Sequence, residues 1–349
     1  MRQTGRVTIS DIARLSGVSA GAVSFALNGK PGVSDETRKR IVQIADEQNW
    51  RPNRSARALG TSPVNVVGLV VNRPARNLGT EAFFAQLLSG IQAGLAGTHT
   101  SMQLLMVGQP ADELRTYRAW SNSQRVDGVI VLDPRINDPR LELLESLGMA
   151  GVVVGNHKSK GGRMSTVRMD DTRAASSLFG YLGALGHRRI KHVSGPAEFE
   201  QTALRAAALQ SGREEFALEL AETIPTNYQP DEAAEATREL LSRRLRPTAI
   251  VYDNDVMAVA GLSVAREMGV EVPSDLSIAA FDNSELALLV HPSITCLTCE
   301  TFELGELAAT TLLAQIHSPT LLDSVAAAQP KLAVRESSSP PASARRESR

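Results

Sequence analysis

Polar side chains directly follow several short apolar runs of this sequence. At these positions they could line a pocket and contact a ligand. Six of them come in pairs after three such runs: Asn72 and Arg73, Asp133 and Arg135, and Asn254 and Asp255. The runs read as parallel strands, and ligands bind beyond the carboxyl ends of such strands. We therefore expect these side chains to line a pocket. Two alternatives stay open: the first four could form surface ion pairs, and Asp255 could cap the helix that begins there.

Two aromatic residues, Phe83 and Tyr228, could stack against the ring of a ligand. The chain has only 8 Phe, 4 Tyr and 2 Trp, so both rings are worth attention as pocket candidates. Burial in the core is the alternative for each of them.

The cysteine and histidine patterns argue against a metal site. Cys296 and Cys299 form a Cys-x-x-Cys pair, but residues 294–300 read as a strand, in which positions three apart face opposite sides. No second pair or nearby histidine completes a zinc set, so we expect structural thiols. His187 reads as a cap near a helix end, and no acid, base and nucleophile assemble. We expect no metal, no cofactor and no catalytic residue.

The elements that would position the polar residues alternate between short β-branched runs and longer helical stretches. Strands are expected near residues 66–71, 102–107, 129–132, 151–154, 190–194, 248–251 and 276–280. Helices are expected near residues 81–97, 111–123, 138–147, 171–185, 202–211, 231–243, 255–268 and 302–316. This alternation predicts an α/β fold with parallel sheets covered on both faces. About 270 residues are long for one sheet, so we expect two lobes with a ligand cleft between them.

The composition excludes several classes of protein. The chain has 349 residues, 42% of them hydrophobic, which favours two or three globular units over wholesale disorder. No apolar run approaches the ~18 residues that span a bilayer, and the first residues lack the apolar core of a signal peptide. Two cysteines cannot build a disulfide framework. We expect a cytoplasmic protein with no membrane partner.

The charge is distributed unevenly although the formal net charge is only −1. Residues 1–62 carry a net charge of +5, and the remaining residues carry −6. A small basic head on an acidic body indicates that the head meets an anionic partner.

The first 50 residues read as three short helices with side-chain caps at Thr8, Ser19 and Ser34. Residues 52–60 could form a further helix, but barely two turns are marginal without tertiary support. Residues 61–63 read as a linker. Residues 337–349 are rich in Ser, Pro and Arg, so we expect a disordered tail, and they carry no leucine heptads.

Several motifs follow one another in a characteristic order along the chain. In the head they are VTISDIA at 7–13, GVS at 17–19, VSFALN at 23–28, VSDETR at 33–38 and PNRSARAL at 52–59. In the body they are LGHRRI at 185–190, SGP at 194–196, NDVMA at 254–258 and AFDN at 280–283. Together these motifs resemble the LacI/GalR family of bacterial transcription regulators, and the resemblance covers about residues 7–336.

The resemblance implies a particular domain organisation. Residues 1–51 would form a helix-turn-helix DNA-binding domain, and residues 52–62 a hinge helix and linker. Residues 63–336 would form a two-lobed effector-binding and dimerisation domain like type I periplasmic binding proteins, followed by the disordered tail 337–349.

The resemblance also assigns residues of the head to DNA contacts. Ala20, Gly21 and Phe25 would face the bases of the major groove, where Phe25 can offer only apolar contact, for example to a thymine methyl. The remaining positions, which would reach phosphates or belong to the hinge, are Thr8, Ser19, Ser24, Asn28, Ser34, Asn53, Arg54, Ala56, Arg57 and Leu59. Because this surface is poor in hydrogen-bond readout, we expect specificity to depend on the hinge and on DNA deformation. The alternative for Phe25 is packing in the small core.

In this family a hinge leucine, matched here by Leu59, enters the minor groove at the centre of the site. Such a wedge unstacks a base step and bends the duplex. Two hinges must meet at the dyad, which implies a homodimer on a palindromic double-stranded operator. Without the resemblance, Leu59 would read as a plain linker residue.

For the effector, the resemblance assigns Arg205 and Asp282. A guanidinium donor and a carboxylate acceptor facing one cleft suit the vicinal hydroxyls of a sugar. A structural salt bridge across the lobes is the alternative. The chain departs from the family pattern at Ala203, where many members have arginine, and at Ala208 and Leu209, so the ligand could differ from common sugars.

The expected function is therefore that of a cytoplasmic DNA-binding transcription regulator, a repressor controlled by a sugar-like effector. A solute-binding protein is the alternative, since it shares the architecture of the body, but it predicts an export signal and no DNA-binding head. An enzyme is a third interpretation, which turnover of sugars would reveal.

Overall fold

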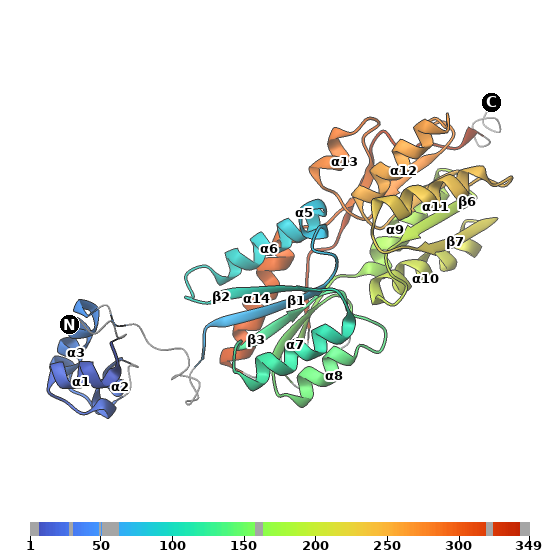
Figure 1. Cartoon of the computed structure of the whole chain (residues 1–349). Coiled ribbons are helices and arrows are strands. Elements are labelled where there is room, and N and C mark those ends of the chain that lie inside the picture. Colours follow the sequence, from blue (N-terminus) through green and yellow to red (C-terminus); the bar gives the residue numbers. More distant parts are fainter. Residues whose placement is uncertain are drawn as a thin grey trace. The chain divides into compact units, whose positions relative to one another are not determined.

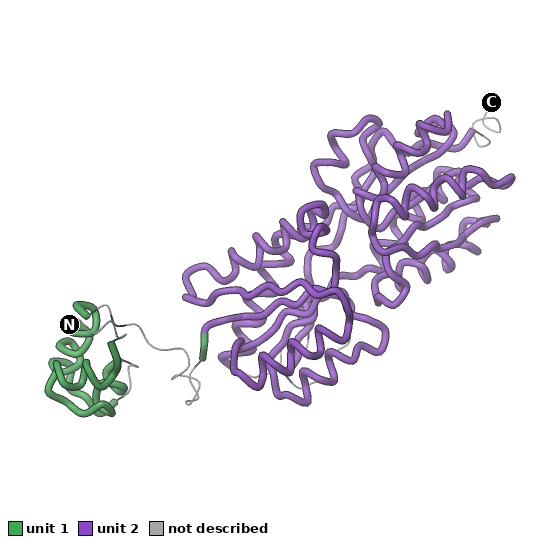
Figure 2. The backbone as a smooth tube through the Cα atoms, viewed as in Figure 1, with its two compact units in different colours: residues 1–64 green, residues 65–349 purple. Residues whose placement is uncertain are grey.

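The computed structural model describes residues 7–27, 31–48, 50, 63–157, 163–318 and 324–342. The chain divides into two compact units, residues 1–64 and 65–349 (Figure 2). The expected hinge at residues 52–62 lies outside the described residues. Within the described ranges, no helix is long and apolar enough to cross a membrane.

The first unit contains α1 (Ile9–Ser16), α2 (Ala20–Leu27) and α3 (Asp35–Glu47). The predicted cap of α1 is confirmed: Thr8 Oγ1 accepts from Asp11 N at 3.3 Å, and the Asp11 carboxylate accepts from Thr8 N at 3.0 Å. The Ser19 and Ser34 hydroxyls likewise accept backbone N–H groups at the starts of α2 and α3. The small core that these helices share consists of Ile12, Ala13, Val23, Ala26, Ile41 and Ala45.

The first lobe of the second unit is built on a six-stranded sheet of order β11-β5-β4-β3-β1-β2, in which every pair is parallel. Its strands are β1 (Val66–Asn72), β2 (Ser101–Val107), β3 (Gly128–Val131), β4 (Ala150–Val154), β5 (Met164–Arg168) and β11 (Ser324–Ala326). Its helices are α5 (Asn77–Thr80), α6 (Ala82–Leu95), α7 (Pro110–Asn122), α8 (Pro139–Ser146) and α14 (Thr301–His317). Helices α6 and α14 cover one face and α7 and α8 the other (Figure 1).

The second lobe repeats this plan with the order β12-β10-β9-β8-β6-β7, in which only β12 is antiparallel to its neighbour. Its strands are β6 (Arg189–Ser194), β7 (Leu220–Pro225), β8 (Ala249–Tyr252), β9 (Ser277–Ala280), β10 (Thr295–Thr298) and β12 (Lys331–Ala333). Its helices are α9 (Asp171–Ala184), α10 (Glu200–Glu215), α11 (Pro230–Ser242), α12 (Asp255–Glu267) and α13 (Glu285–Leu289). Helices α9 and α10 pack on one face, and α11 and α12 on the other.

The chain passes between the lobes after β5, after β10 and after β11. The predicted α/β class, the parallel sheets and the two lobes are thus confirmed. Because the strands are parallel, their carboxyl ends place loops from both lobes along one cleft.

Residues 337–342, which the sequence assigns to a disordered tail, contact the second lobe. Ser337 is fully buried, and its hydroxyl donates to the Ile278 carbonyl at 2.6 Å. The Ser337 N–H donates to Ser293 O, and the Ser339 N–H donates to Ser277 Oγ. The expectation of disorder is therefore wrong for residues 337–342. Their serine hydroxyl and backbone groups form hydrogen bonds with residues in and next to β9 and β10. Residues 343–349 lie outside the described residues.

Candidate functional site

A cavity lies between the two lobes, at the carboxyl ends of both sheets, and we call it the interlobe cavity. Seven of the predicted pocket residues line it: Arg73, Phe83, Asp133, Arg205, Tyr228, Asn254 and Asp282. Four further polar side chains line it that the sequence did not single out: Glu81, Asp171, Gln201 and Asp253. Its volume of about 80 Å³ is well below the ~300–1,000 Å³ of ordinary ligand sites. A ligand must therefore displace side chains or separate the lobes.

Arg205 of α10 is held by two carboxylates of the second lobe. Its Nη1 donates to Asp253 Oδ1 at 2.8 Å, and its Nη2 donates to Asp171 Oδ1 at 3.2 Å. Its guanidinium lies 4.2 Å from the centre of the Phe281 ring. Burial alone would raise the pKa of Asp253, but Arg205, His192 and the Gly195 N–H outweigh it and hold that pKa well below its usual range. Arg205 makes no ion pair with Asp282, so the salt bridge considered as an alternative is not formed.

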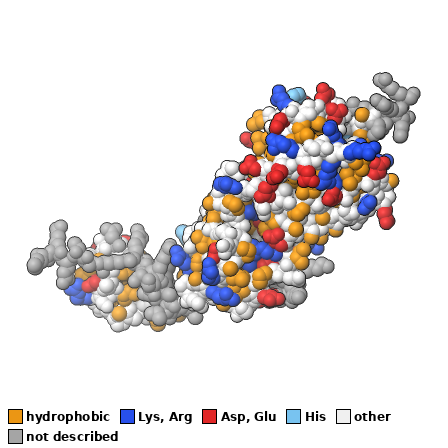
Figure 3. Space-filling view, turned by 45° about the vertical axis from the view of Figure 1, so that its right-hand side comes forward, with side chains coloured by type: hydrophobic (Ala, Val, Ile, Leu, Met, Phe, Trp, Pro, Cys, Tyr) orange, Lys and Arg blue, Asp and Glu red, His pale blue; other side chains and the backbone are white. Residues whose placement is uncertain are grey.

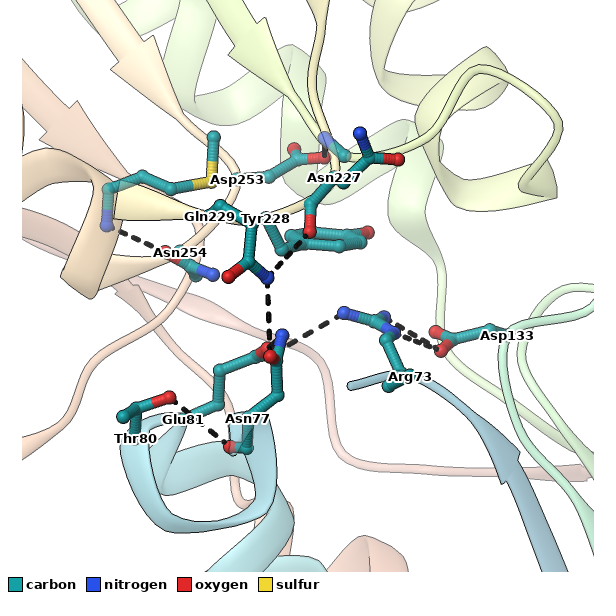
Figure 4. Close-up of polar contacts among 12 residues, drawn as sticks. Arg73, Asn77, Thr80, Glu81, Asp133, Asn227, Tyr228, Gln229, Asp253 and Asn254 are labelled. Carbon is teal, nitrogen blue, oxygen red and sulfur yellow. Dashed lines mark hydrogen bonds and ion pairs between the residues drawn. The ribbon is translucent and has the colours of Figure 1, made fainter. Parts of the chain in front are cut away.

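Arg73, directly after β1, is the second cation of the cavity. It donates to Asp133 Oδ2 through Nε at 3.2 Å and Nη2 at 2.7 Å, and its Nη1 lies 3.5 Å from Glu81 Oε2 (Figure 4). Its guanidinium also lies 4.1 Å from the centre of the Tyr228 ring, which belongs to the other lobe. Both arginines of the cavity are thus already neutralised by carboxylates.

The Tyr228 ring depends on a glycine opposite it. A Cβ atom at position 195 would lie 2.0 Å from Tyr228 Cζ, so only glycine leaves room for the ring. Tyr228 itself has a φ of +62° and is 7% exposed. The Tyr228 ring therefore packs in the core of the second lobe and also lines the interlobe cavity.

Several polar groups at the cavity have no partner in the described part of the chain. The Arg205 Nε and the Asn254 Nδ2 are buried donors without an acceptor. The Asp282 carboxylate, on the loop after β9, makes no hydrogen bond or ion pair with any described residue. Buried polar groups normally have partners, so the two buried donors point to a ligand with acceptors, and the half-buried Asp282 carboxyl lines the same cavity.

Burial, and next the nearby Asp255 carboxylate, raise the pKa of Asp282 to about 8. The folded protein then keeps a proton on Asp282 that the unfolded chain releases near its ordinary pKa of 3.8. Folding takes up a proton between these values, so this group makes stability fall as pH rises from about 4 to about 8. The neutral acid can donate one hydrogen bond and accept another.

Replacing Asp282 by asparagine is expected to remove this pH dependence. Asp282→Asn should melt at a higher temperature than the wild type at pH 8, with little difference at pH 4. Each unit of pKa separation corresponds to about 1.4 kcal/mol, so calorimetry across this range resolves the change. Asp231→Asn, an exposed aspartate at the start of α11, is the control. A difference that stays constant from pH 4 to pH 8 would contradict the assignment.

Three predicted pocket residues do not line the interlobe cavity. Asn72 ends β1 outside its wall, and Arg135 turns away because its Nη2 donates to the buried Glu113 at 2.6 Å. Asp255 does not cap α12, because Asn254 does so by accepting from Met257 N at 2.8 Å. The Asp255 carboxylate instead accepts from Ser284 N at 2.9 Å and lines a smaller neighbouring cavity. These are corrections to the sequence-based expectations.

The four polar cavity residues that were not predicted differ in how well the sequence could have indicated them. Asp253 lies at the same strand end as Asn254, so the rule that selected Asn254 could have selected it too. Glu81 and Asp171 stand at helix starts, where a carboxylate ordinarily reads as a favourable partner of the helix dipole. Gln201 carries no signal of its own.

Cys296 is buried in β10 and Cys299 follows that strand, and both are free thiols. Burial raises the pKa of both thiols, to about 12 and about 11. His187 accepts or donates hydrogen bonds with Thr248 Oγ1 at 2.9 Å and Ser339 O at 3.0 Å, so it ties the tail to the second lobe. None of these groups reaches the cavity.

The head presents a second candidate surface. Phe25 of α2 is 45% exposed and lies outside the small core, beside Gly32. The alternative that Phe25 packs in the core is therefore wrong. Ala20 and Gly21 begin the same helix, and neither adds a polar side chain to its exposed surface. The predicted contacts at Asn28, Asn53, Arg54, Ala56, Arg57 and Leu59 lie outside the described residues.

One short motif of the head resembles a catalytic signature in its letters only. Residues 17–21 read GVSAG, the Gly-x-Ser-x-Gly pattern of hydrolases. That signature requires a turn from a strand into a helix, whereas Ser19 lies between α1 and α2. Its hydroxyl accepts from Ala22 N at 3.1 Å, so it serves as a helix cap.

Comparison with known proteins finds relatives for both parts of the chain. Residues 8–53 match the model for bacterial regulatory proteins of the lacI family, and residues 179–338 match a periplasmic binding protein-like domain. The crystal structure of a LacI family transcriptional regulator from Bifidobacterium animalis subsp. lactis is similar to this one, with a TM-score of 0.72. The two sequences are 34% identical, and the match covers 80% of this chain and 100% of that one. The chain belongs to the LacI family.

Other relatives of this LacI-family protein are regulators by name. The HTH-type transcriptional repressor PurR of Serratia proteamaculans is 28% identical over 95% of this chain and 96% of its own length. The structure of a transcriptional regulator CelR-cellobiose complex is 27% identical, with a TM-score of 0.71 over 95% of this chain and 100% of that one. The family places a helix-turn-helix head before a periplasmic binding protein-like body, as found here.

Proposed function

We propose that this LacI-family protein is a cytoplasmic transcriptional repressor that binds a palindromic operator as a homodimer and responds to a sugar-like effector. The observation that carries the proposal is the interlobe cavity, whose unpartnered donors and free carboxylic acid lie in the same chain as a family DNA-binding head. The relatives are named as regulators, and we propose that this chain likewise catalyses no reaction.

The chemistry of the cavity supports a polyhydroxylated effector without negative charge. Arg73 and Arg205 are both engaged by carboxylates, so neither is available to neutralise a phosphate or a carboxylate. Hydroxyl groups can accept from the Arg205 Nε and the Asn254 Nδ2 and exchange hydrogen bonds with Asp282. The sugar named with CelR, cellobiose, has this chemistry.

The head supports a readout that depends little on hydrogen bonds to bases. Ala20 and Gly21 have no side-chain donors or acceptors, and Phe25 offers an exposed ring. We propose that the hinge, with Leu59 as a wedge, and the deformability of the operator supply the remaining specificity.

The distribution of charged side chains supports the head, and not the body, as the part that binds DNA. Lys and Arg side chains are interspersed with Asp and Glu over the face of the body seen in Figure 3. The excess of positive charge is in residues 1–62 instead. Phosphate contacts from the head should therefore dominate the electrostatics of DNA binding.

Dimerisation has a candidate surface on the second lobe. Helix α13 exposes Leu286, Leu288 and Leu289, the last of them 80% exposed. A second copy of this chain is the proposed occupant, because two hinges must meet at the centre of a palindrome. Closure or rotation of the lobes would then change the separation of the two hinges.

Selection of DNA sequences by the full-length protein, with binding read at two salt concentrations, tests this function. We expect a palindrome with a deformable central step and a steep loss of affinity as salt rises. Weak, sequence-independent binding, or a flat dependence of log K on log salt, would contradict the proposal. The selected operator then serves as the probe with which sugars are screened for release of DNA.

A further inference from the structure

The segment between β3 and α8, residues 133–138, makes backbone hydrogen bonds with the other lobe. Ile136 N donates to Glu198 O at 2.9 Å, and Glu200 N donates to Pro134 O at 2.8 Å. Between them, Arg135 and Phe199 are paired as in an antiparallel sheet. We call residues 133–138 and 198–200 together the clasp. It joins the lobes through main-chain atoms.

The clasp is connected to the wall of the interlobe cavity. Gln201 Nε2 donates to Asp133 Oδ1 at 3.0 Å across the lobes, while Arg73 holds the other oxygen of Asp133 (Figure 4). His157 Nδ1 lies 3.1 Å from Glu200 Oε1, which adds another contact between the lobes. A ligand that displaces Arg73 or Gln201 from Asp133 would therefore act directly on one end of the clasp.

A further contact across the cleft is of a different kind. Gln229 Oε1 accepts from Arg76 at 3.0 Å, and Gln229 Nε2 donates to Asn77 Oδ1 at 3.2 Å. These bonds use flexible side chains, and Arg76 is exposed. The main-chain bonds of the clasp, in contrast, require residues 133–138 to keep one particular backbone shape.

That backbone shape is unusual and is held from within the first lobe. Asp133 and Asn137 have φ angles of +49° and +56°, a conformation that side chains adopt rarely. Arg140 Nη2 donates to the Asp133 carbonyl at 2.8 Å. The Asp138 carboxylate accepts from Arg135 N at 3.0 Å. Both ends of the segment are thus fixed by charged side chains.

These side chains belong to one buried network of two cations and two anions. Glu113 of α7 accepts from Arg135 at 2.6 Å and from Arg140 at 2.8 Å, and Arg140 Nη2 also donates to Asp138 at 2.6 Å. Glu113 is 0%, Arg140 2%, Asp138 6% and Arg135 9% exposed. None of the four lines the interlobe cavity. Removing one member of such a network leaves an uncompensated buried charge.

We propose that Glu113, Arg135, Asp138 and Arg140 are positioning residues that hold the clasp closed and so set the lobe equilibrium on which the effector acts. This inference rests on the proposed function only where it concerns the effector. Because the cavity volume is only about 80 Å³, a sugar enters by displacing side chains or by separating the lobes, and these four residues oppose the separation. A ligand shifts such an equilibrium only by its differential affinity for the two states.

Hydrogen exchange of the full-length protein, without DNA or ligand, tests the inference. The N–H groups of Ile136 and Glu200 report on the clasp from opposite lobes, and β1 reports on the stability of the first lobe. In Glu113→Gln we expect exchange at least tenfold faster in residues 133–138 and in residues 198–201, with β1 unchanged. Arg135→Met should act in the same direction by at least threefold, and it leaves Glu113 paired with Arg140.

Two variants are controls for loss of an ion pair elsewhere. Lys191→Met removes a fully buried cation that pairs with Glu222 in the second lobe, and Glu267→Gln breaks the exposed pair with Arg238. Neither should change exchange in the clasp. If Glu113→Gln does not fold, Arg135→Met decides the question.

Three results would overturn the inference: no change in either segment, faster exchange in residues 133–138 alone, or faster exchange that β1 shares equally. The first removes any role of the network, the second confines it to one loop, and the third makes it a matter of general stability. Because no DNA is present, failure of operator selection would count against the proposed function and leave this result standing.

Discussion

Replacing Arg205 by methionine is expected to lower the free energy of unfolding by about 3–5 kcal/mol, the usual effect of removing one partner from a buried ion pair. Arg205 compensates both Asp253 and Asp171, which are 2% and 5% exposed. Methionine keeps much of the length of the side chain, so the loss comes from the uncompensated carboxylates and not from a cavity. Calorimetry should show a melting temperature lower by about 10 °C.

The pH dependence identifies the cause of this loss. In the wild type the pKa of Asp253 is depressed, so Asp253 contributes stability above its unfolded pKa of 3.8 that is lost as the pH falls through the folded value. Without Arg205 the largest part of this contribution is lost, while His192 and the Gly195 N–H remain. The deficit of Arg205→Met should therefore be largest near neutral pH and shrink below pH 4.

Arg213→Met on the same helix is the matched control, because Arg213 is exposed. It should change stability by less than about 0.5 kcal/mol. A deficit in Arg205→Met that is equal at pH 7 and pH 3, or one that Arg213→Met shares, would show that burial of the charge is not the cause.

The sequence predicted most strands from short runs of apolar or β-branched residues, and it missed strands that lack such a run. Strand β5 was not predicted, because Ser165 and Thr166 at its centre are polar although both are 1% exposed. Strand β7 lies at the edge of its sheet and is nowhere fully buried, so its side chains show no apolar run. In both strands the sheet neighbours, and not the local pattern, determine the structure.

The residues of the interlobe cavity likewise fall into those that a local sequence pattern predicts and those that it does not. Strand ends predicted Arg73, Asp133 and Asn254 at the cavity, because the carboxyl end of a parallel strand is fixed by topology. Arg135 was misplaced, since the positive φ of Asp133 redirects the chain and Glu113 draws the guanidinium inward. The pairing of Gln201 with Asp133 depends on how the two lobes close, which no local pattern encodes.

The second large effect is expected in the head, where Phe25→Ala should weaken binding to the selected operator about tenfold or more. Loss of one base-pair recognition element typically costs about 1–3 kcal/mol, and Phe25 is the large side chain among the three predicted base-facing residues. Sequence-independent binding should be unchanged, because phosphate contacts supply it. Titration of the selected operator and of a scrambled duplex at one salt concentration separates the two.

Stability distinguishes this role from a structural one. Phe25 is 45% exposed and outside the core of Ile12, Val23 and Ile41, so its removal should leave the melting temperature within about 2 °C. Val42→Ala on α3 removes a similarly exposed apolar side chain, 41% exposed, and should change neither stability nor operator preference. A lower melting temperature with unchanged selectivity in Phe25→Ala would assign the ring to folding. Reduced affinity for the operator alone would make it a reader of the major groove, by apolar contact where hydrogen bonds are absent.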